Sequence, residues 1–220
     1  MSAIKVSAFR WVPPFAQGLV RDLRVRWALE EAGLSYEEQL LDFGSGKSES
    51  YRKLQPFGQV PAYQEEGLVL FESGAVVLHV AERSTALLPS HGPARARATS
   101  WMFAALNTVE PPIMSLVQLD LKFADDDAAR RMREAVTDAV KDRLASVAEW
   151  LGDRGYLEDR FTAGDLLMVT VLRILRHTDL VTGMPALAAY LVRCEARPAF
   201  KKALAAQMAV FADNAALAPA

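Results

Sequence analysis

The chain has 220 residues, of which 51% are hydrophobic and 24% are charged. This globular balance excludes disorder as the main state, and the length predicts one large domain or two small ones. Because 25 Lys and Arg residues stand against 27 Asp and Glu residues, the net charge of −2 argues against a nucleic-acid binder that works through bulk positive charge.

The first part of the chain alternates between strand and helix patterns. Strands are predicted over residues 4–9, 36–43, 60–63 and 68–71, from alternating apolar and polar residues or from strand-like composition. Apolar residues are spaced as on a helix from Phe15 to a closing glycine, Gly33, and again over residues 73–83. Residues 44–58 predict a loop with one helical turn at 50–54. The order β-α-β followed by β-β-α predicts a compact α/β domain with a mixed sheet.

After a linker at 85–93 that contains Pro and Gly, helical periodicity runs almost unbroken. Helices are predicted over residues 94–110, 125–151, 162–177, 185–196 and 198–210. Pro111 and Pro112 stop or kink the first of them. We therefore expect two domains, an α/β domain over residues 1–84 and an all-α domain over residues 93–220.

Several classes of protein are excluded by what the sequence lacks. The single cysteine, Cys194, allows no internal disulfide and no CxxC pair, which predicts a reducing, cytoplasmic compartment. We expect no signal peptide, no membrane span and no metal site, because the N-terminus, the apolar runs and the three histidines have none of the required patterns. Glycine-rich phosphate motifs and GxSxG are also absent, which disfavours Rossmann, P-loop and α/β-hydrolase enzymes.

The dipeptide Val60-Pro61 stands at the start of a predicted strand, where proline cannot donate a ladder hydrogen bond. A cis peptide there would expose the N–H and C=O of Val60 at a sheet edge, where an extended peptide ligand could pair with them. An ordinary trans proline on an edge strand is the alternative, and the dipeptide alone leaves both open.

Glu72 and Ser73 follow the last predicted strand. Ser73 is placed to cap the next helix, and a helix N-terminus with a hydroxyl also suits a carboxylate. The neighbouring glutamate could hold an ammonium group, so the pair would suit the charged head of an α-amino acid. A plain helix cap beside a solvated glutamate is the alternative.

In tandem, these two motifs resemble the glutathione-site signature of glutathione transferases. Residues 54–63 (LQPFGQVPAY) and 70–76 (LFESGAV) are similar to the family's N-P-x-G-[KQ]-V-P-x-L, hairpin and E-S-x-A-I pattern. Residues 25–33 (VRWALEEAG) resemble its first helix, and residues 161–165 (FTAGD) resemble the capping box of its second domain. The resemblance implies a thioredoxin-like N-terminal domain with a mixed four-stranded sheet, an all-helical bundle as C-terminal domain, and a homodimer.

The resemblance also implies roles for individual residues. The backbone of Val60, with Pro61 in cis, would bind the cysteinyl part of glutathione, and Glu72 and Ser73 would hold its γ-glutamyl head. Lys47 and Gln59 match positions that meet the glycine end in several classes of the family, although Lys47 could equally be a solvated loop residue.

The catalytic segment departs from the family, because residues 8–34 contain no Ser, Thr, Tyr or Cys. The connection after the first strand is also about eight residues longer than usual, and its periodicity predicts that the extra residues lengthen the first helix. We therefore expect free amides around Phe15 to Gln17, aided by Arg10 or Arg21 and the Gln17 side chain, to replace the missing hydroxyl. The arginines could instead be solvated or paired with carboxylates.

Four residues are candidates for the wall of an electrophile site: Trp11, Phe15, Trp101 and Asn107. An aromatic stripe on a helix such as the one with Trp101 could equally belong to the core. The first hypothesis is an enzyme that conjugates glutathione, as its thiolate, to a small apolar electrophile in detoxification. A glutathione-dependent peroxidase or dehalogenase, and a non-catalytic glutathione-binding or interaction protein, are the alternatives.

Overall fold

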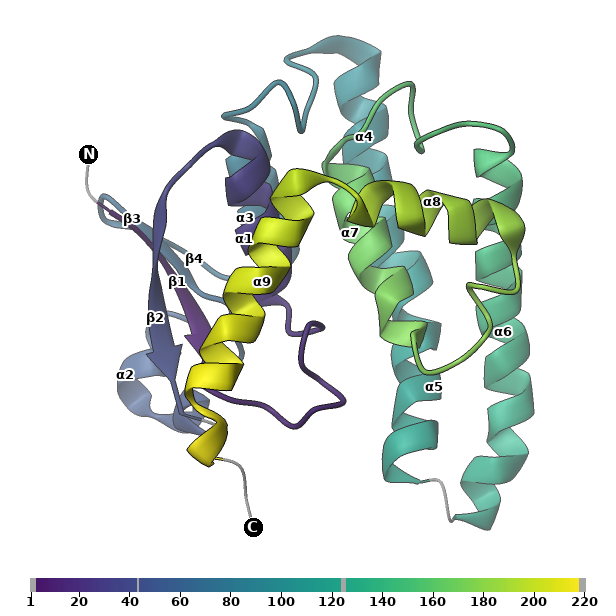
Figure 1. Cartoon of the computed structure of the whole chain (residues 1–220), viewed down its shortest axis with the longest axis horizontal. Coiled ribbons are helices and arrows are strands. Elements are labelled where there is room, and N and C mark those ends of the chain that lie inside the picture. The colour runs from purple at the N-terminus through teal and green to yellow at the C-terminus, as the bar shows by residue number, and fades with distance from the viewer. Residues whose placement is uncertain (1–2, 43, 124–125, 218–220) are drawn as a thin grey trace. The chain divides into compact units, whose positions relative to one another are not determined.

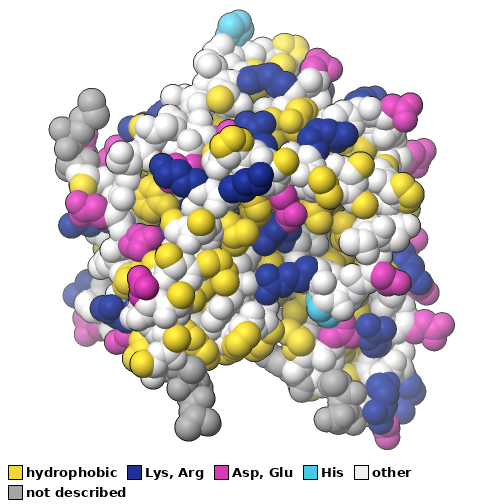
Figure 2. Space-filling view, viewed as in Figure 1, with side chains coloured by type: hydrophobic (Ala, Val, Ile, Leu, Met, Phe, Trp, Pro, Cys, Tyr) yellow, Lys and Arg dark blue, Asp and Glu magenta, His cyan; other side chains and the backbone are white. Residues whose placement is uncertain are grey.

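The computed structural model describes residues 3–42, 44–123 and 126–217. Two compact units emerge from its contacts (Figure 1): residues 1–87 together with 197–220, here the α/β unit, and residues 88–196, here the helical unit. Among the described residues, no helix is long and apolar enough to cross a membrane. On the face drawn in Figure 2, acidic and basic side chains are interspersed with hydrophobic ones.

A mixed sheet forms the centre of the α/β unit. Its strands are β1 (Ile4–Phe9), β2 (Tyr36–Leu41), β3 (Tyr63–Glu65) and β4 (Leu68–Leu70). They lie in the order β2-β1-β3-β4, with β1 parallel to β2, and β3 antiparallel to both β1 and β4. The mixed four-stranded sheet and the closing hairpin are therefore confirmed.

The third strand begins later than predicted, at Tyr63 instead of residue 60. Pro61 has no N–H to donate, and the N–H of Ala62 is bound by the Ser7 hydroxyl at 2.6 Å and not by a neighbouring strand. The segment 60–62 consequently runs as a loop along β1, tied to it by the bond from Ser7 N to Ala62 O at 2.9 Å.

The first helix is shorter than predicted, because α1 spans Asp22–Ala32 and residues 10–21 form a series of turns. In this turn segment, the N–H of Ala16 donates to Pro13 O at 2.8 Å and that of Leu19 to Ala16 O at 3.0 Å. Gly18 has φ 75°, a left-handed conformation that an α-helix cannot include. The expected lengthening of the helix is therefore wrong, whereas its closure at left-handed Gly33 is confirmed.

Two further helices of this unit follow the sheet strands. A 3₁₀ turn at Ser45–Lys47 leads to α2 (Glu49–Arg52), close to the helical turn expected at 50–54, and α3 (Ser73–Ala81) follows the hairpin.

The last long helix, α9 (Pro198–Asp213), packs against α1 (Figure 1). Phe200 meets Trp27 edge-on with ring centroids 4.8 Å apart, and Arg197 donates two hydrogen bonds, 2.6 and 2.7 Å long, to the carboxylate of Glu31. The α/β unit therefore includes residues 197–220, which differs from the expected boundary that assigned everything after residue 93 to the helical part. A short 3₁₀ turn, Ala215–Leu217, follows α9.

The helical unit contains α4 (Gly92–Ala104), α5 (Glu110–Lys122), α6 (Asp127–Leu151), α7 (Ala163–Leu172) and α8 (Pro185–Glu195). A π-helical turn, Ala105–Val109, joins α4 to α5, and a 3₁₀ turn, Arg173–Leu175, extends α7. The sequence did not predict α5. Pro111 and Pro112 lie in its first turn, and helical structure runs unbroken from Gly92 to Lys122, so the prolines do not stop the helix. The π-helical turn immediately before them is an irregularity of the kind that accompanies a kink, which is the other predicted effect of these prolines.

The capping box predicted at the start of α7 is confirmed and forms a buried polar centre of the helical unit. The carboxylate of Asp165 accepts the N–H groups of Leu157 and Thr162, both at 2.8 Å, and the Tyr190 hydroxyl at 2.9 Å. Gly164 packs so tightly that an added Cβ would lie 2.7 Å from that of Trp101. Asp165 therefore joins α7 to α8 through Tyr190, and the neighbouring Gly164 packs α7 against α4.

Candidate functional site

The loop before β3 presents the backbone of Val60. The Val60–Pro61 peptide is cis, so the structure decides between the two alternatives for this dipeptide. Among the described residues, no hydrogen bond joins the N–H or C=O of Val60 to another group. An extended peptide could therefore pair with these two groups as an added strand does.

The second motif lies at the start of α3. Ser73 is the first helical residue and not the cap that the sequence predicts, because the first helical bond runs from Val76 N to Glu72 O at 3.0 Å. Glu72 has φ 65° and ψ 113°, a conformation that costs a non-glycine residue about 1–3 kcal/mol. Such strain is typical of functional sites, and the Glu72 side chain is exposed there.

A buried arginine supports this helix start. Arg24, in the first turns of α1, is 3% exposed, and its Nη1 donates to Ser73 Oγ at 3.3 Å. A guanidinium can only donate, so it occupies a lone pair of the hydroxyl and leaves the Ser73 proton to donate elsewhere. Together with the unpaired N–H groups of a helix N-terminus, this arrangement suits a carboxylate. No sequence motif had pointed to Arg24.

Two glycines bring the loops of Lys47 and Gln59 together. A Cβ added at Gly46 would lie 2.0 Å from Gly58 O, so the two backbones touch directly. Gln59 keeps its side chain exposed while its N–H donates to the Gln55 side chain at 3.1 Å. The two residues expected at the glycine end of the ligand are therefore carried by contacting loops.

A chain of hydrogen bonds runs beneath the Val60 loop. Tyr51 donates to Gln59 O at 2.6 Å, and Ser7 Oγ lies 2.7 Å from the Tyr51 hydroxyl. Both hydroxyls are buried, and burial raises the pKa of the Tyr51 phenol. This pair was not predicted, because 44 residues separate Ser7 from Tyr51. The sequence signal is a serine between two apolar residues of β1, Val6 and Ala8.

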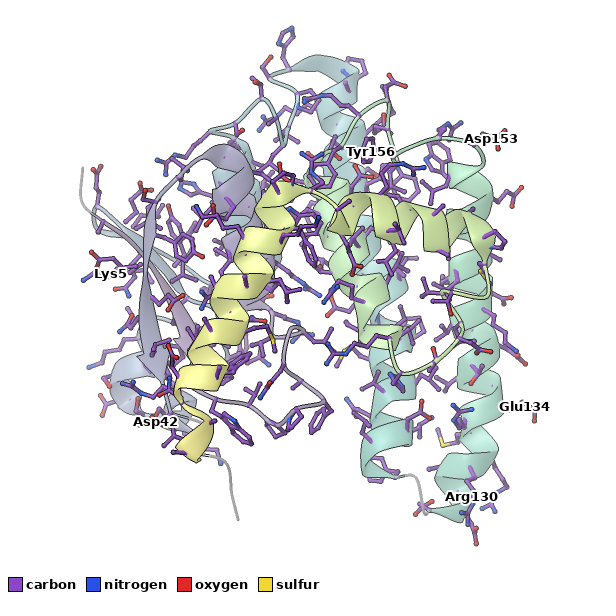
Figure 3. The ribbon with its side chains drawn as sticks, in the orientation of Figure 1. Lys5, Asp42, Arg130, Glu134, Asp153 and Tyr156 are labelled. Carbon is purple, nitrogen blue, oxygen red and sulfur yellow. The ribbon has the colours of Figure 1, made fainter. Side chains whose placement is uncertain are left out.

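The turn segment 10–21 places the three proposed catalytic residues differently from expectation. Arg10 forms an ion pair with Asp42 (labelled in Figure 3), with Nε 3.1 Å from Oδ1, and both side chains are well exposed. Gln17 donates its side-chain amide to Val12 O at 3.0 Å, which closes the segment on itself. The amides of Ala16 and Gln17 donate to Pro13 and Pro14 carbonyls, so the expected free amides at a helix end are absent around these two residues.

The end of the turn segment lies close to the Val60 loop. Val20 packs against the buried cluster of Tyr51, Val60 and Ala62, and the next residue, Arg21, precedes α1. Asp22, the first residue of α1, is buried and forms a hydrogen bond with Arg26 at 2.6 Å. Burial raises the pKa of Asp22 although Arg26 opposes the rise. Its carboxylate occupies the start of α1, so that helix end is poorly suited to a thiolate.

The four electrophile-site candidates belong to different units. Trp11 and Phe15 lie in the turn segment of the α/β unit, where Phe15 is 60% exposed. Trp101 lies on α4 of the helical unit, and its ring packs against Trp150 with centroids 5.3 Å apart. Asn107 is exposed on the π-helical turn that follows. Turns of this kind occur frequently at functional sites.

Comparison with known sequences gives matches over both units. The family model described as glutathione S-transferase, N-terminal domain, matches residues 17–82, and the one described as glutathione S-transferase, C-terminal domain, matches residues 107–198. Glutathione S-transferase PARB of Nicotiana tabacum is 32% identical over 200 residues, which are 83% of this chain and 91% of that one. Glutathione S-transferase 4 of Zea mays is 29% identical over 215 residues, 92% and 93% of the two chains.

Comparison with solved structures gives the same fold. A glutathione transferase family member from Pseudomonas fluorescens, with two glutathione molecules bound, has a TM-score of 0.79 at 21% identity, over 92% of each chain. Poplar glutathione transferase F1 has a TM-score of 0.80 at 23% identity, over 95% of this chain and all of the other. The expected architecture, a thioredoxin-like domain with a mixed sheet and a helical second domain, is thereby confirmed.

Proposed function

The chain belongs to the glutathione S-transferase family, and from this we propose that it binds glutathione as the thiolate and transfers it to a small apolar electrophile. The observation that carries the proposal is the pairing of two sites in the α/β unit. One is the Val60 backbone with unpaired N–H and C=O groups, and the other is the start of α3 with Ser73 and Arg24. The structure of the Pseudomonas fluorescens family member with bound glutathione supports this choice of ligand.

The γ-glutamyl head of glutathione carries an ammonium group and a carboxylate. We assign the carboxylate to the Ser73 hydroxyl and the N-terminal amides of α3, with the buried charge of Arg24 behind them. The ammonium group is assigned to Glu72, whose exposed carboxylate precedes the helix.

The cysteinyl part would then pair with the backbone of Val60, and the glycine carboxylate would meet Lys47 and Gln59. The contact between Gly46 and Gly58 supports this assignment, because it keeps the loops of Lys47 and Gln59 adjacent. The ligand would thus lie extended along the edge of the segment 60–62.

Conjugation needs an ionised thiol. A free thiol with a pKa of about 8.5 is roughly 3% ionised at pH 7, and a pKa lower by two units would make it about three-quarters ionised. Without a Ser, Tyr or Cys in the turn segment, we assign this role to Arg21 and Arg10, with Gln17 as a hydrogen-bond donor. The bond from Gln17 to Val12 uses only one of the two amide hydrogens.

Two alternatives follow from the same site. A peroxidase or dehalogenase would direct the same thiolate at another electrophile. A non-catalytic glutathione-binding protein is favoured by one observation: the Ser7 and Tyr51 hydroxyls are committed to Ala62, to each other and to Gln59.

We also propose that the protein is a cytoplasmic homodimer. Support for the dimer comes from exposed apolar side chains of the α/β unit: Phe57, Leu68, Val69 and Phe71. The rings of Phe57 and Phe71 lie 6.1 Å apart, so part of this surface is contiguous. Contiguous exposed apolar surface is typical of association sites. The presence of only one cysteine, which is buried, supports the reducing compartment.

The ultraviolet difference spectrum of glutathione bound to the protein, titrated against pH, tests the catalytic proposal. A thiolate signal that persists well below pH 8 supports it, and loss of that signal on replacing Arg21 or Arg10 by Gln identifies the activating residue. Binding without a thiolate signal supports the non-catalytic alternative, and no binding contradicts the proposed function.

A further inference from the structure

The hydrogen bonds beneath the Val60 loop have only one consistent direction. Gln59 O can only accept, so the single proton of Tyr51 points to it. The hydrogen bond between Ser7 and Tyr51 must then be donated by Ser7, and Ser7 Oγ in turn accepts from Ala62 N at 2.6 Å. We call this directed chain from Ala62 through Ser7 and Tyr51 to Gln59 the hydroxyl relay.

The hydroxyl relay holds both flanks of the segment on which the ligand is proposed to lie. One end binds the backbone of Gln59, immediately before Val60, and the other binds the backbone of Ala62, immediately after Pro61. Its two hydroxyls come from β1 and α2, which are separate elements. The side chains of Ser7 and Tyr51 therefore fix the orientation of the Val60 N–H and C=O relative to the sheet.

Three of the four residues of the hydroxyl relay are buried, and Gln59 at its end is exposed. Ser7 is 1% exposed, Tyr51 4% and Ala62 fully buried. Without the Tyr51 hydroxyl, the carbonyl of Gln59 loses its only protein donor among the described residues, so the loop would shift as this carbonyl finds another partner. Tyr51 also packs in one apolar cluster with Val60 and Ala62, and a phenylalanine ring would keep those contacts.

We propose that Ser7 and Tyr51 are positioning residues that hold the Val60 backbone in register to pair with the cysteinyl amide of glutathione. The inference rests on the function proposed above. Neither hydroxyl acts on the sulfur, because each proton is already donated within the hydroxyl relay.

The test compares two ligands that differ in one hydrogen-bond donor. Isothermal titration calorimetry measures the Kd of S-methylglutathione and of its depsipeptide, in which an ester oxygen replaces the amide N–H between the γ-glutamyl and cysteinyl residues. For the wild-type protein we expect the amide to bind about tenfold more tightly. In Tyr51→Phe and in Ser7→Ala, we expect this ratio to fall to about threefold or less, with the double variant no worse than either single one.

Tyr63→Phe is the matched control. It removes a buried phenol that also donates a 2.6 Å hydrogen bond, to Glu65, but outside the hydroxyl relay, and its ratio should match the wild type. Near-ultraviolet circular dichroism verifies that each variant is folded. Equal weakening of both ligands in Tyr51→Phe and Ser7→Ala, with the ratio unchanged, overturns the inference and leaves the proposed function standing. Failure of the wild type to bind either ligand overturns both.

Discussion

Gly46 and Gly58 touch backbone to backbone, and a Cβ on Gly46 would lie 2.0 Å from the carbonyl oxygen of Gly58. Gly58 has φ 68°, so its own conformation also favours glycine. No side chain moves out of the way at such a contact, because the atom encountered belongs to the backbone. The two loops proposed to hold the glycine end of the ligand can therefore approach this closely only because both contact positions are glycine.

Gly46→Ala should separate these loops. We expect a loss of about 1–3 kcal/mol in the free energy of unfolding, measured by urea denaturation, and weaker glutathione binding, because Lys47 moves with its loop. Gly155→Ala is the control, since its Cβ would meet only the Arg193 side chain, at 3.9 Å. Unchanged stability in Gly46→Ala would show that the loops adapt to the added methyl group.

Glu72 should show opposite effects on stability and binding. Glu72→Gly relieves the strained backbone at φ 65° and should raise the free energy of unfolding by about 1 kcal/mol, while glutathione binds more weakly without the carboxylate. Glu72→Gln keeps the strain and removes the charge, so only binding should fall. Calorimetric Kd values and urea denaturation of the same samples separate the two effects. If Glu72→Gly loses stability, the strain is compensated by contacts of the Glu72 side chain.

Glu65 should make the α/β unit sensitive to acid. The Tyr63 hydroxyl, 2.6 Å away, and the Arg83 guanidinium lower the pKa of this carboxyl from its ordinary 4.5. Because the folded state binds the proton less readily than the unfolded chain, the stabilisation is complete above pH 4.5 and is lost as the pH falls through the lower folded pKa. Urea denaturation between pH 3 and 6 should therefore show a smaller pH slope in Glu65→Gln. An identical slope would assign acid sensitivity to other carboxyls.

Asp165 should be the costliest single residue to truncate in the helical unit. Asp165→Ala leaves the N–H groups of Leu157 and Thr162 and the Tyr190 hydroxyl without their acceptor, all in the interior. We expect a loss of about 3–5 kcal/mol in the free energy of unfolding. Thr162→Ser keeps the capping hydroxyl and should cost less than about 1 kcal/mol. Similar losses in the two variants would mean that the donors find other partners.

Local patterns predicted the parts of the site that are contiguous in sequence. Val60-Pro61 and Glu72-Ser73 each lie within one short motif, and the mixed character of the sheet follows from the order of the predicted strands and helices. The turn segment was mispredicted because the spacing of Phe15 and Leu19 fits a helix, and only the left-handed Gly18 breaks it. Similarly, Pro111 and Pro112 were predicted to stop or kink the helix, and the sequence did not show that helical structure continues beyond them as α5.

The missing parts are contacts between distant residues. Ser7 reaches Tyr51 across 44 residues, and Arg24 reaches Ser73 across 49. No periodicity within a segment encodes such a pair, because each partner is separately plausible as an ordinary strand serine or helix arginine. The packing of α9 on α1 is the most extensive contact of this kind. The hydrophobic face of α9 predicts a helix, but it does not predict which element that face covers.

The packing of α9 on α1 has a consequence for biosynthesis. The first 196 residues leave the ribosome before the helix that covers Trp27 through Phe200 and that binds Asp22 through Gln207 at 2.7 Å. The helical unit, a continuous stretch from residue 88 to 196, is complete by then. Domains generally mature in the order of synthesis. Here the unit that is synthesised first receives its final helix last.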